Sequence, residues 1–509
     1  MEEGAIDEFE SSINLCFGDH PFIFSGEADL WSFAHCGEAS VERSPRWRLA
    51  LSHQLGGRQD RATATTEPCK CAGCRLFGDP RRDLAPCFAV SFSLGGSCLL
   101  PGDGPPEGLC ALMTKFKEAG FAVYIVGGAI RDAMLYGSWR AVIDWDLATS
   151  ALPYQVEALF PHTIPQGREH GTVRVLSGDI EAEVTTFRIE GGYSDHRRPD
   201  TVSFTGQIQK DLQRRDFTIG AMAYDPLVQE FVDPYGGRED LEGRLLRAVG
   251  DPRLRLAEDH LRMLRAVRFA STLAFQLEES LAQAICEASH NIGTIAPERI
   301  AMELVKILRG PDPARGLLLL QELGLLREVM PQLGPDLELS LGIIAQTPPV
   351  LDLRIAAMLW GSSEEVARDI LSRLRFPRSL VERVLLLLGW QQINPQGWTE
   401  HQMRQFLSQA GKGRALDLVA LWRAEARSRG EDTLKLEAQL EHLVILAGQD
   451  LPLRLEDLAM DGRGVMELLA LEPGPGVGEI LNYLLAKVIE NPALNNEAAL
   501  QQLVLKWKE

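Results

Sequence analysis

The chain has 509 residues, of which 45% are apolar and 24% are charged, and this is the composition of an ordinary globular protein. That length predicts several domains with sizeable cores and excludes a disordered, collagen-like or disulfide-stapled chain. The 52 basic and 71 acidic side chains give a net charge of −19, which argues against a protein that coats DNA regardless of sequence.

No apolar stretch reaches the roughly 18 residues that a membrane-spanning helix needs. The first residues, Met-Glu-Glu-Gly, show neither the basic nor the apolar region of a secretory signal. We therefore expect a cytoplasmic protein without membrane contact.

Eight of the nine cysteines lie within the first 110 residues. Residues 1–105 are also broken by glycine, proline and short charged clusters, so we expect an N-terminal extension with little regular structure. The thiols of Cys69, Cys71, Cys74 and Cys87 have a spacing that could hold zinc. A zinc ribbon would show two C-x2-C pairs and this segment does not, which favours the alternative of unpaired thiols.

From residue 121 the sequence alternates between short apolar runs and glycine turns, which is typical of a mixed α/β domain. The predicted elements are a strand at 121–126, a helix at 129–136 and strands at 142–147, 172–176 and 181–187. Beyond about residue 255 the strand signals stop and helical periodicity continues to the end. The sequence therefore predicts a mixed α/β domain followed by an all-helical array.

Two aspartates and a glycine turn carry the first chemical signal. Residues two apart in a strand point the same way, so the carboxylates of Asp144 and Asp146 converge and suit Mg²⁺. Upstream, Gly127 and Gly128 precede a helix start, where backbone N–H groups can bind a phosphate that Arg131 also reaches. Each motif alone could be an ordinary strand end or turn, but their occurrence within 20 residues favours a metal and phosphate site.

Two further clusters are open to two interpretations each. Glu183, or Glu181 on the same face of its strand, could supply a third carboxylate, and the alternative is an edge strand with solvated acids. Arg214, Arg215 and Asp216 could contact a triphosphate and ribose, and the alternative is a surface salt-bridge cluster.

The segment from 258 to 268 predicts a helix that places Asp259, Arg262, Arg265 and Arg268 one turn apart. An amphipathic helix without further role would show the same pattern. However, a carboxylate accepts from the amino group of cytosine or adenine, and a guanidinium donates to the neighbouring ring nitrogen. Asp259 and Arg262 could therefore hold CTP or ATP and reject UTP and GTP.

Taken together, these motifs resemble the class II tRNA nucleotidyltransferases, the CCA-adding enzymes, and the bacterial poly(A) polymerases that share their catalytic head. The resemblance covers about 107–335. It rests on Gly127-Gly128-Ala-Ile-Arg131-Asp132, Asp144-Trp-Asp146, Glu183-Val-Thr-Thr-Phe-Arg188, Arg214-Arg215-Asp216-Phe-Thr, Asp233-Pro-Tyr-Gly-Gly, Val249-Gly250-Asp251-Pro, Glu258-Asp259-His-Leu-Arg262 and Pro297-Glu298-Arg299-Ile300.

The resemblance implies an α+β nucleotidyltransferase head with a mixed β-sheet and helices, followed by an all-α neck, body and tail. The implied bounds are 106–246 for the head, 247–315 for the neck with base recognition, 316–430 for the body and 431–509 for the tail. It also implies template-independent addition of CMP or AMP or both, from CTP and ATP, to the 3′ end of tRNA.

By the same likeness, Asp144 and Asp146 bind two Mg²⁺ ions and Glu183 joins them as a catalytic carboxylate. The implied nucleotide-binding residues are Gly127, Gly128, Arg131, Asp132, Arg215, Asp216, Asp259, Arg262, Arg265 and Arg268. One departure concerns Gly220, because the family usually has an Asn there that looks like a ribose or phosphate contact.

Alternatives remain within this family. The stretch His170-Gly171-Thr172-Val173 and the loop at 190–199 resemble the CCA-adding or A-adding form. The other possibilities are a poly(A) polymerase, which extends many RNAs, and an inactive RNA-binding homologue. A basic face of the body could contact tRNA, or be an ordinary solvated surface, and it comprises Lys412, Arg414, Arg423, Arg427 and Arg429. The oligomeric state stays open.

Overall fold

The computed structural model describes residues 13–17, 20–24, 100–165, 171–194, 199–333, 337–430 and 433–507. The chain divides into two units, 1–96 and 97–509. In the first unit, strands β1 (Ile13–Phe17) and β2 (His20–Phe24) pair antiparallel. The predicted zinc thiols between residues 69 and 87, and most of the predicted extension, lie outside the described residues.

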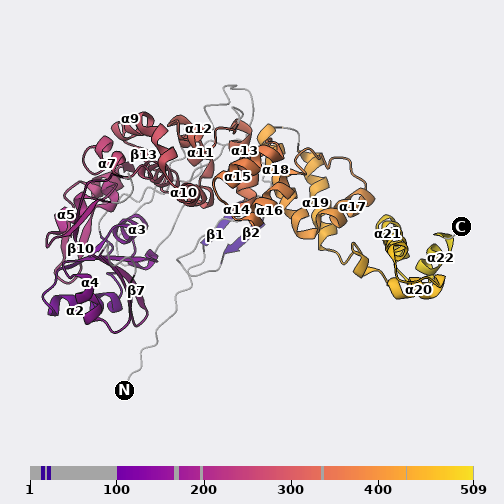
Figure 1. Cartoon of the computed structure of the whole chain (residues 1–509), viewed down its shortest axis with the longest axis horizontal. Helices are drawn as coiled ribbons and strands as arrows, with labels where there is room; N and C mark the ends of the chain where they lie inside the picture. The colour runs from indigo at the N-terminus through magenta and orange to yellow at the C-terminus, as the bar shows by residue number, and fades with distance from the viewer. Residues whose placement is uncertain are drawn as a thin grey trace, which may run out of the picture. The chain divides into compact units, whose positions relative to one another are not determined.

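The head is built on a seven-stranded mixed sheet in the order β11-β10-β3-β4-β7-β6-β5 (Figure 1). Strands β4 and β7 run parallel, and the other neighbouring pairs are antiparallel. The strands are β3 (Val123–Val126), β4 (Trp145–Thr149), β5 (Thr163–Pro165), β6 (Thr172–Ser177), β7 (Ile180–Thr186), β10 (Ala223–Asp225) and β11 (Glu230–Val232).

At β3 the sheet is buried on both faces, because all four residues of this strand are buried and their side chains alternate between the two faces. Val123 and Ile125 of β3 face one core, whereas Tyr124 and Val126 face the other. The first core is covered by α2 (Glu107–Glu118), α3 (Gly128–Tyr136) and α4 (Pro153–Leu159), and the second by α5 (Ile208–Gln213). The mixed sheet with covering helices confirms the predicted class of the head.

The strand predicted at 142–147 is shorter than expected and begins at Trp145. A 3-10 turn, η1 (Trp139–Ala141), precedes it. The buried indole of Trp139 stacks on Trp145 at 6.2 Å and on Tyr224 at 5.7 Å between ring centroids. Because this packing bends the chain, Asp144 lies in the loop before the strand, and only Asp146 of the pair is a strand residue.

A ribbon and short elements lead from the sheet into the neck. They are β8 (Arg188–Gly191), β9 (Thr201–Phe204), η3 (Thr218–Gly220), α6 (Gly237–Glu242), β12 (Leu245–Leu246), α7 (Pro252–Glu258), α8 (Arg262–Thr272), β13 (Gln276–Leu277), α9 (Glu279–Ala288), η4 (Ser289–Thr294) and α10 (Pro297–Arg309). The parallel pairing of β12 with β13 ties the end of the head to the neck.

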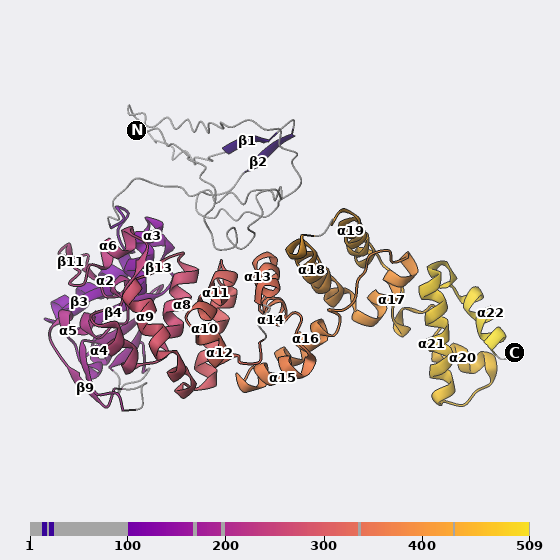
Figure 2. The ribbon, with the colours of Figure 1, turned by 90° about the horizontal axis from the view of Figure 1, so that it is seen from above.

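The rest of the described chain is helical, as predicted (Figure 2). The elements are α11 (Pro313–Glu322), α12 (Leu325–Val329), α13 (Leu337–Gln346), α14 (Leu351–Met358), α15 (Glu364–Arg373), α16 (Arg378–Leu388), α17 (Glu400–Ala410), α18 (Lys412–Arg429), α19 (Leu434–Gly448), η5 (Leu455–Asp457), α20 (Gly462–Leu469), α21 (Pro475–Glu490), η6 (Pro492–Leu494) and α22 (Glu497–Trp507). None of the helices in the described ranges is long and apolar enough to span a membrane.

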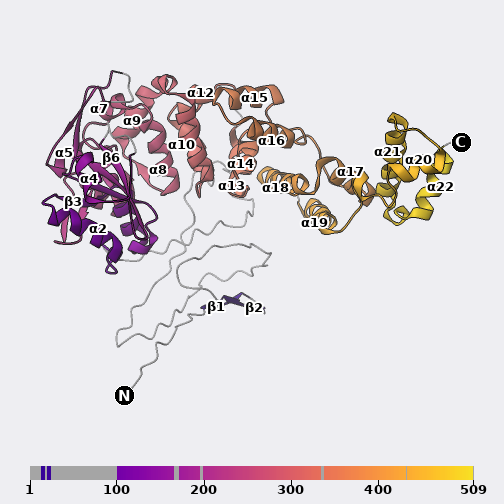
Figure 3. The same ribbon diagram turned by 60° about the horizontal axis from the view of Figure 1, so that its bottom comes forward.

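The last helices have a core of their own and are joined to α17 by a buried arginine. Helices α20, α21 and α22 pack around a separate cluster that includes Val465, Leu484 and Val504 (Figure 3). Arg404 of α17 donates to the carbonyls of Ile489 and Glu490 at 2.7 and 2.8 Å. Those carbonyls end α21 and have no partner within the helix, so Arg404 caps it from outside.

The contact between α6 and η3 is close enough to require glycine. A Cβ added at Gly237 would lie 2.2 Å from the carbonyl oxygen of Thr218. We expect Gly237→Ala to displace η3 and to lower the free energy of unfolding by about 1–3 kcal/mol, the usual cost of overpacking. Thermal unfolding of the full chain, followed by circular dichroism, measures the loss.

The matched control is Gly413→Ala in α18, where an added Cβ meets no atom within 4 Å. Alanine is more stable than glycine within a helix. We therefore expect Gly413→Ala to leave the melting temperature unchanged or to raise it slightly. Equal melting temperatures for the two variants would contradict the crowding argument.

Candidate functional site

The carboxylates of the site gather where β4 and β7 run side by side. Asp146 stands opposite Glu183 in the parallel register, and Asp144 precedes β4 with an exposed side chain. Burial raises the pKa of Asp146 to about 6, and repulsion from Glu183 and Asp144 adds to the rise against the opposing effect of Arg215. The three acids are therefore close enough to interact.

The register also distinguishes the two candidate glutamates. Glu181 is exposed and pairs with Arg174 at 2.6 Å, so its charge is already compensated. Glu183 stands beside Asp146 and contributes to its pKa. Glu183 is the one of the two that belongs to the carboxylate cluster.

The glycine turn lies directly against this cluster. Gly127 has a φ of 67°, which favours glycine, and an added Cβ would lie 2.9 Å from Nη1 of Arg215 and 3.6 Å from Oδ2 of Asp146. A Cβ on Gly128 would lie 3.6 Å from Nη2 of Arg131. The turn, two guanidinium groups and Asp146 thus meet in one place. Helix α3 begins there, so its N-terminal N–H groups are available to an anion.

Arg215 is held in this position by its own segment. Its guanidinium donates from Nη1 to the carbonyl of Gly220 at 3.2 Å and from Nη2 to the buried Asp211 at 3.3 Å. Arg214 binds the same carboxylate at 2.9 Å. These residues are largely buried, which excludes the alternative of a surface salt-bridge cluster.

Asp216 connects the head to α8. It accepts a hydrogen bond from Nε of Arg265 at 2.7 Å and one from the N–H of Phe217 at 3.0 Å. Burial pushes the pKa of Asp216 upward, but the charges of Arg265 and Arg262 outweigh it and hold the pKa below its ordinary value. Asp216 is therefore ionised and is part of a buried network.

The structure corrects the predicted ridge from Asp259 to Arg268. Helix α7 ends at Glu258, and α8 begins only at Arg262, so Asp259 lies between two helices with an extended backbone. The break follows from His260, whose buried ring makes a 2.9 Å contact with Thr294. The three arginines share α8, and Asp259 approaches from the preceding turn.

The predicted base-reading pair is held by separate partners. Asp259 accepts from Nη2 of Arg299 at 2.9 Å. Arg262 forms an ion pair with Glu258 and donates to the carbonyl of Arg214 at 3.3 Å. Arg299 was part of the family motif in the sequence but had no assigned role, because its partner lies 40 residues away.

The remaining predicted cations surround one aromatic ring. The guanidinium carbons of Arg131, Arg265 and Arg268 lie 5.2, 5.6 and 4.1 Å from the ring centroid of Phe269. Arg131 also pairs with Asp132 at 2.8 Å. Arg268 pairs with Glu303 of α10 at 2.7 Å. The ring thus brings together cations of the head and the neck.

Two further predictions concern His170 with the loop at 190–199, and the basic face of the body. His170 and residues 195–198 of the predicted loop lie outside the described residues. In the proposed basic face, Arg423 and Arg427 both pair with Glu437, at 2.6 and 2.7 Å. Arg429 pairs with a further glutamate of its own helix at 2.9 Å. Most of that face is electrically compensated, which favours the solvated surface.

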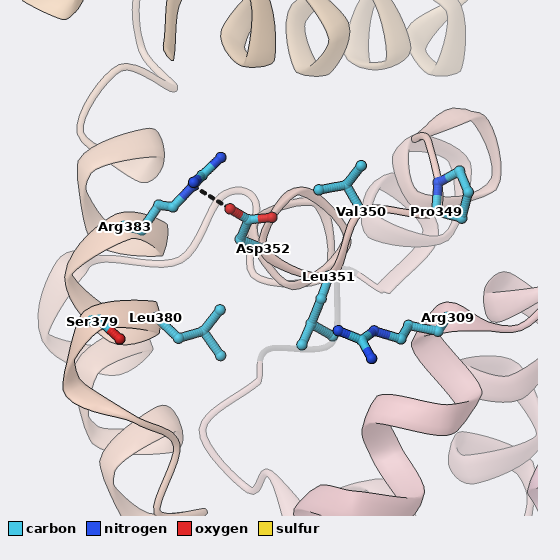
Figure 4. A pocket seen from close by; sticks show the side chains of 8 residues that line it. All are labelled: Arg309, Pro349, Val350, Leu351, Asp352, Ser379, Leu380 and Arg383. Atoms are coloured by element: carbon cyan, nitrogen blue, oxygen red, sulfur yellow. Dashed lines mark ion pairs between the residues drawn. The ribbon is translucent and has the colours of Figure 1, made fainter. Parts of the chain in front are cut away.

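A pocket of about 700 Å³ lies away from the carboxylates, among α10, α14 and α16 (Figure 4). Asp352 and Arg383 form an ion pair on one side of it, and the exposed side chain of Arg309 extends along the other. Leu351 and Leu380 lie between them. The pocket thus combines the apolar side chains of Leu351 and Leu380 with the guanidinium of Arg309, which forms no ion pair with a carboxylate of the described residues.

The donor set near β4 suits a divalent cation. Within the described ranges, no three His, Cys, Asp or Glu side chains are grouped so as to hold a metal by themselves. However, Mg²⁺ is usually held by one or two carboxylates together with substrate phosphates. A buried carboxylate whose pKa is raised by its acidic neighbours, as in Asp146, is stabilised in its ionised form by such a cation.

Three family models match the chain. They are the Poly A polymerase head domain at 123–247, the "Probable RNA and SrmB- binding site of polymerase A" at 274–337 and the tRNA nucleotidyltransferase domain 2 at 352–504. Together these segments span the head and most of the helical part.

Curated relatives and solved structures agree with these matches. The CCA-adding enzyme of Geobacillus sp. (strain WCH70) is 36% identical over 411 residues, which cover 79% of this chain and 97% of the relative. The crystal structure of the Bacillus stearothermophilus CCA-adding enzyme in complex with CTP is 34% identical with a TM-score of 0.66, covering 79% and 97%. The Thermotoga maritima CCA-adding enzyme complexed with tRNA shares the fold, at 19% identity and a TM-score of 0.57 over 79% and 94%. The chain belongs to the family of CCA-adding enzymes.

Proposed function

We propose that this protein adds CMP and AMP, without a template, to the 3′ end of tRNA in the cytoplasm. The observation that carries the proposal is the connection of two groups of residues by one buried segment. Arg215 joins the carboxylate cluster at Asp146, and the carbonyl of Arg214 binds Arg262 of the base-reading pair. A nucleoside triphosphate bound across this segment would have its phosphates at the metal site and its base at Arg262.

The chain's own residues would position the reactants. Asp144 and Asp146 would hold Mg²⁺, which when bound lowers the pKa of the attacking 3′-hydroxyl and stabilises the pyrophosphate leaving group. Arg131 and Arg215 lie beside the glycine turn and would bind the triphosphate. Glu183 stands next to Asp146 and would orient it and add negative charge to the cation site.

Base selection would rest on hydrogen-bonding capacity that the protein leaves free. The contacts of Asp259 with Arg299 and with the N–H of Leu261 leave a lone pair for an amino group. Arg262 uses only part of its five N–H groups. Cytosine and adenine would use this remaining lone pair and these remaining N–H groups, whereas uracil and guanine would leave them without a partner.

For tRNA, the pocket at Arg309 is the candidate contact in the helical part. Arg309 ends α10 within the segment that matches the RNA-binding family model, and its guanidinium is exposed. An exposed cation beside an apolar floor suits a phosphate of the RNA backbone.

The second candidate function is a poly(A) polymerase, and the match of 123–247 to the Poly A polymerase head domain favours it. The proposed base-reading pair argues against it, because Asp259 and Arg262 would accept cytosine as well as adenine. Incorporation of CMP separates the two functions.

The decisive experiment supplies purified protein, Mg²⁺, labelled CTP or ATP, and tRNAs that lack one, two or three terminal nucleotides. We expect three additions that stop at CCA, and we expect Asp146→Asn to lower kcat at least about 10³-fold because the cation loses its buried ligand. Asp179→Asn, in the exposed turn between β6 and β7, is the matched control and keeps full activity. Long A tails on unrelated RNA would instead establish the poly(A) polymerase.

A second prediction concerns Arg299. Replacing it by Met removes a charged hydrogen bond worth about 1.5–3 kcal/mol from Asp259, so kcat/KM for CTP should fall roughly 10- to 100-fold. Selectivity for CTP over UTP should narrow, and Arg299→Lys should recover part of both. Arg368→Met removes an exposed pair with Glu364 and serves as control. Unchanged selectivity in Arg299→Met would contradict the positioning role.

A third prediction concerns Arg309. If it contacts a phosphate, Arg309→Gln should lower the slope of log Kd for tRNA against log salt by about 1. Filter binding at several salt concentrations measures the slope. Arg378→Gln, an exposed arginine paired with Glu382, should leave it unchanged. Equal slopes for both variants and the wild type would remove Arg309 from the RNA interface.

A further inference from the structure

We infer that Gly220 is a specificity-determining residue that leaves open space beside the sugar of the incoming nucleotide. The space would admit a substituent on a ribose hydroxyl, such as a 2′-O-methyl group. This inference rests on the proposed function, because it concerns the nucleotide that the enzyme transfers.

The first observation is that the backbone does not need glycine at this position. Gly220 ends η3 with a φ outside the positive range that favours glycine, so another residue could adopt its conformation. An added Cβ would meet one atom within 4 Å, Oδ1 of Asp216 at 4.0 Å. Gly237, which packs on the same turn, is by contrast crowded to 2.2 Å. Glycine at position 220 therefore leaves a space that a larger side chain would occupy.

The second observation is an unused donor next to this space. Arg215 reaches the carbonyl of Gly220 through Nη1 at 3.2 Å, yet its Nε is buried and has no hydrogen-bond partner within the described part of the chain. Buried donors are nearly always satisfied, so this one points to a group that is bound during function. Asp216 supplies an acceptor close by, because Oδ1 accepts only the N–H of Phe217 among the described contacts.

The hydroxyl of a sugar both accepts and donates, so it could use the Nε donor of Arg215 and the Oδ1 acceptor of Asp216. The order of base, ribose and phosphates in the nucleotide leads to the same position for the sugar. Its ribose joins the base to the phosphates, and the protein joins the corresponding groups through residues 214–220. Arg214 binds Arg262 at the base end, and Arg215 adjoins Gly127 at the phosphate end. The sugar therefore lies along this segment.

The enzyme should therefore discriminate less against a substituent on the ribose of the incoming nucleotide. A side chain at position 220 would extend toward Asp216 and occupy the volume that a 2′-O-methyl group needs. An Asn side chain at position 220 would fill this volume, whereas Gly220 leaves it free. The wild-type protein should therefore use 2′-O-methyl-CTP with an efficiency near that of CTP.

The test compares kcat/KM for 2′-O-methyl-CTP and CTP, with a tRNA that lacks its terminal nucleotides and with Mg²⁺. For the wild type, kcat/KM for 2′-O-methyl-CTP should be no more than about tenfold below that for CTP. In Gly220→Ala and Gly220→Asn, kcat/KM for 2′-O-methyl-CTP relative to CTP should fall at least about tenfold below the wild-type value, which is the range in which a pocket rejects a group of this size. Gly413→Ala should keep the wild-type ratio. A wild-type enzyme that rejects 2′-O-methyl-CTP as strongly as Gly220→Asn, or a ratio that neither variant changes, overturns the inference.

Calorimetric binding of both nucleotides to the full chain separates this inference from the proposed function. Binding of CTP and 2′-O-methyl-CTP with similar Kd, and weaker binding of the methylated nucleotide to Gly220→Asn, supports the open space even if no CMP is transferred. Transfer of CMP with exclusion of 2′-O-methyl-CTP would overturn the inference and leave the proposed function standing. Melting temperatures near the wild-type value confirm that the variants fold.

Discussion

The ion pair between Asp216 and Arg265 is the interaction on which the site depends, because it joins the head to the first long helix of the neck. The side chains of Arg265 and Asp216 are only 34% and 16% exposed, so removal of either partner would leave a partly buried charge without its counter-charge. The same connection is reinforced by Phe217 and Phe269, whose rings meet edge to face at 5.7 Å. These contacts hold the residues proposed to bind phosphates and those proposed to read the base at a fixed spacing.

The two buried aspartates of the site show how neighbours decide the role of a carboxylate. Asp216 faces guanidinium groups, so its pKa lies below the ordinary value and the protein itself supplies its counter-charge. Burial, with added repulsion from Glu183 and Asp144, raises the pKa of Asp146 to about 6, and its counter-charge is incomplete. One carboxylate is thus structural, and the other is left for a cation to stabilise.

Much of this arrangement could be predicted from sequence because it is local. The apolar run before Gly127 and the spacing of Asp144 and Asp146 predicted the strand, turn and acidic cluster. The register that selects Glu183 over Glu181 could not be predicted, because pairing between β4 and β7 involves residues almost 40 positions apart. The helix break after Glu258 was missed because the Asp259 to Arg268 spacing fits a helix equally well, and a buried tertiary contact of His260 overrides it.

The glycines of the site show why a motif alone is not sufficient. Gly127 and Gly237 are needed because a side chain would collide with Arg215 or with Thr218, whereas Gly220 meets no such obstacle. The sequence does not distinguish these three glycines, because it shows only that each position has no side chain. Whether that lack relieves crowding or creates space depends on the elements that pack around it. At position 220 the nearest atom to an added Cβ is Oδ1 of Asp216, at 4.0 Å, so a side chain there would extend toward one partner of the ion pair that joins head and neck.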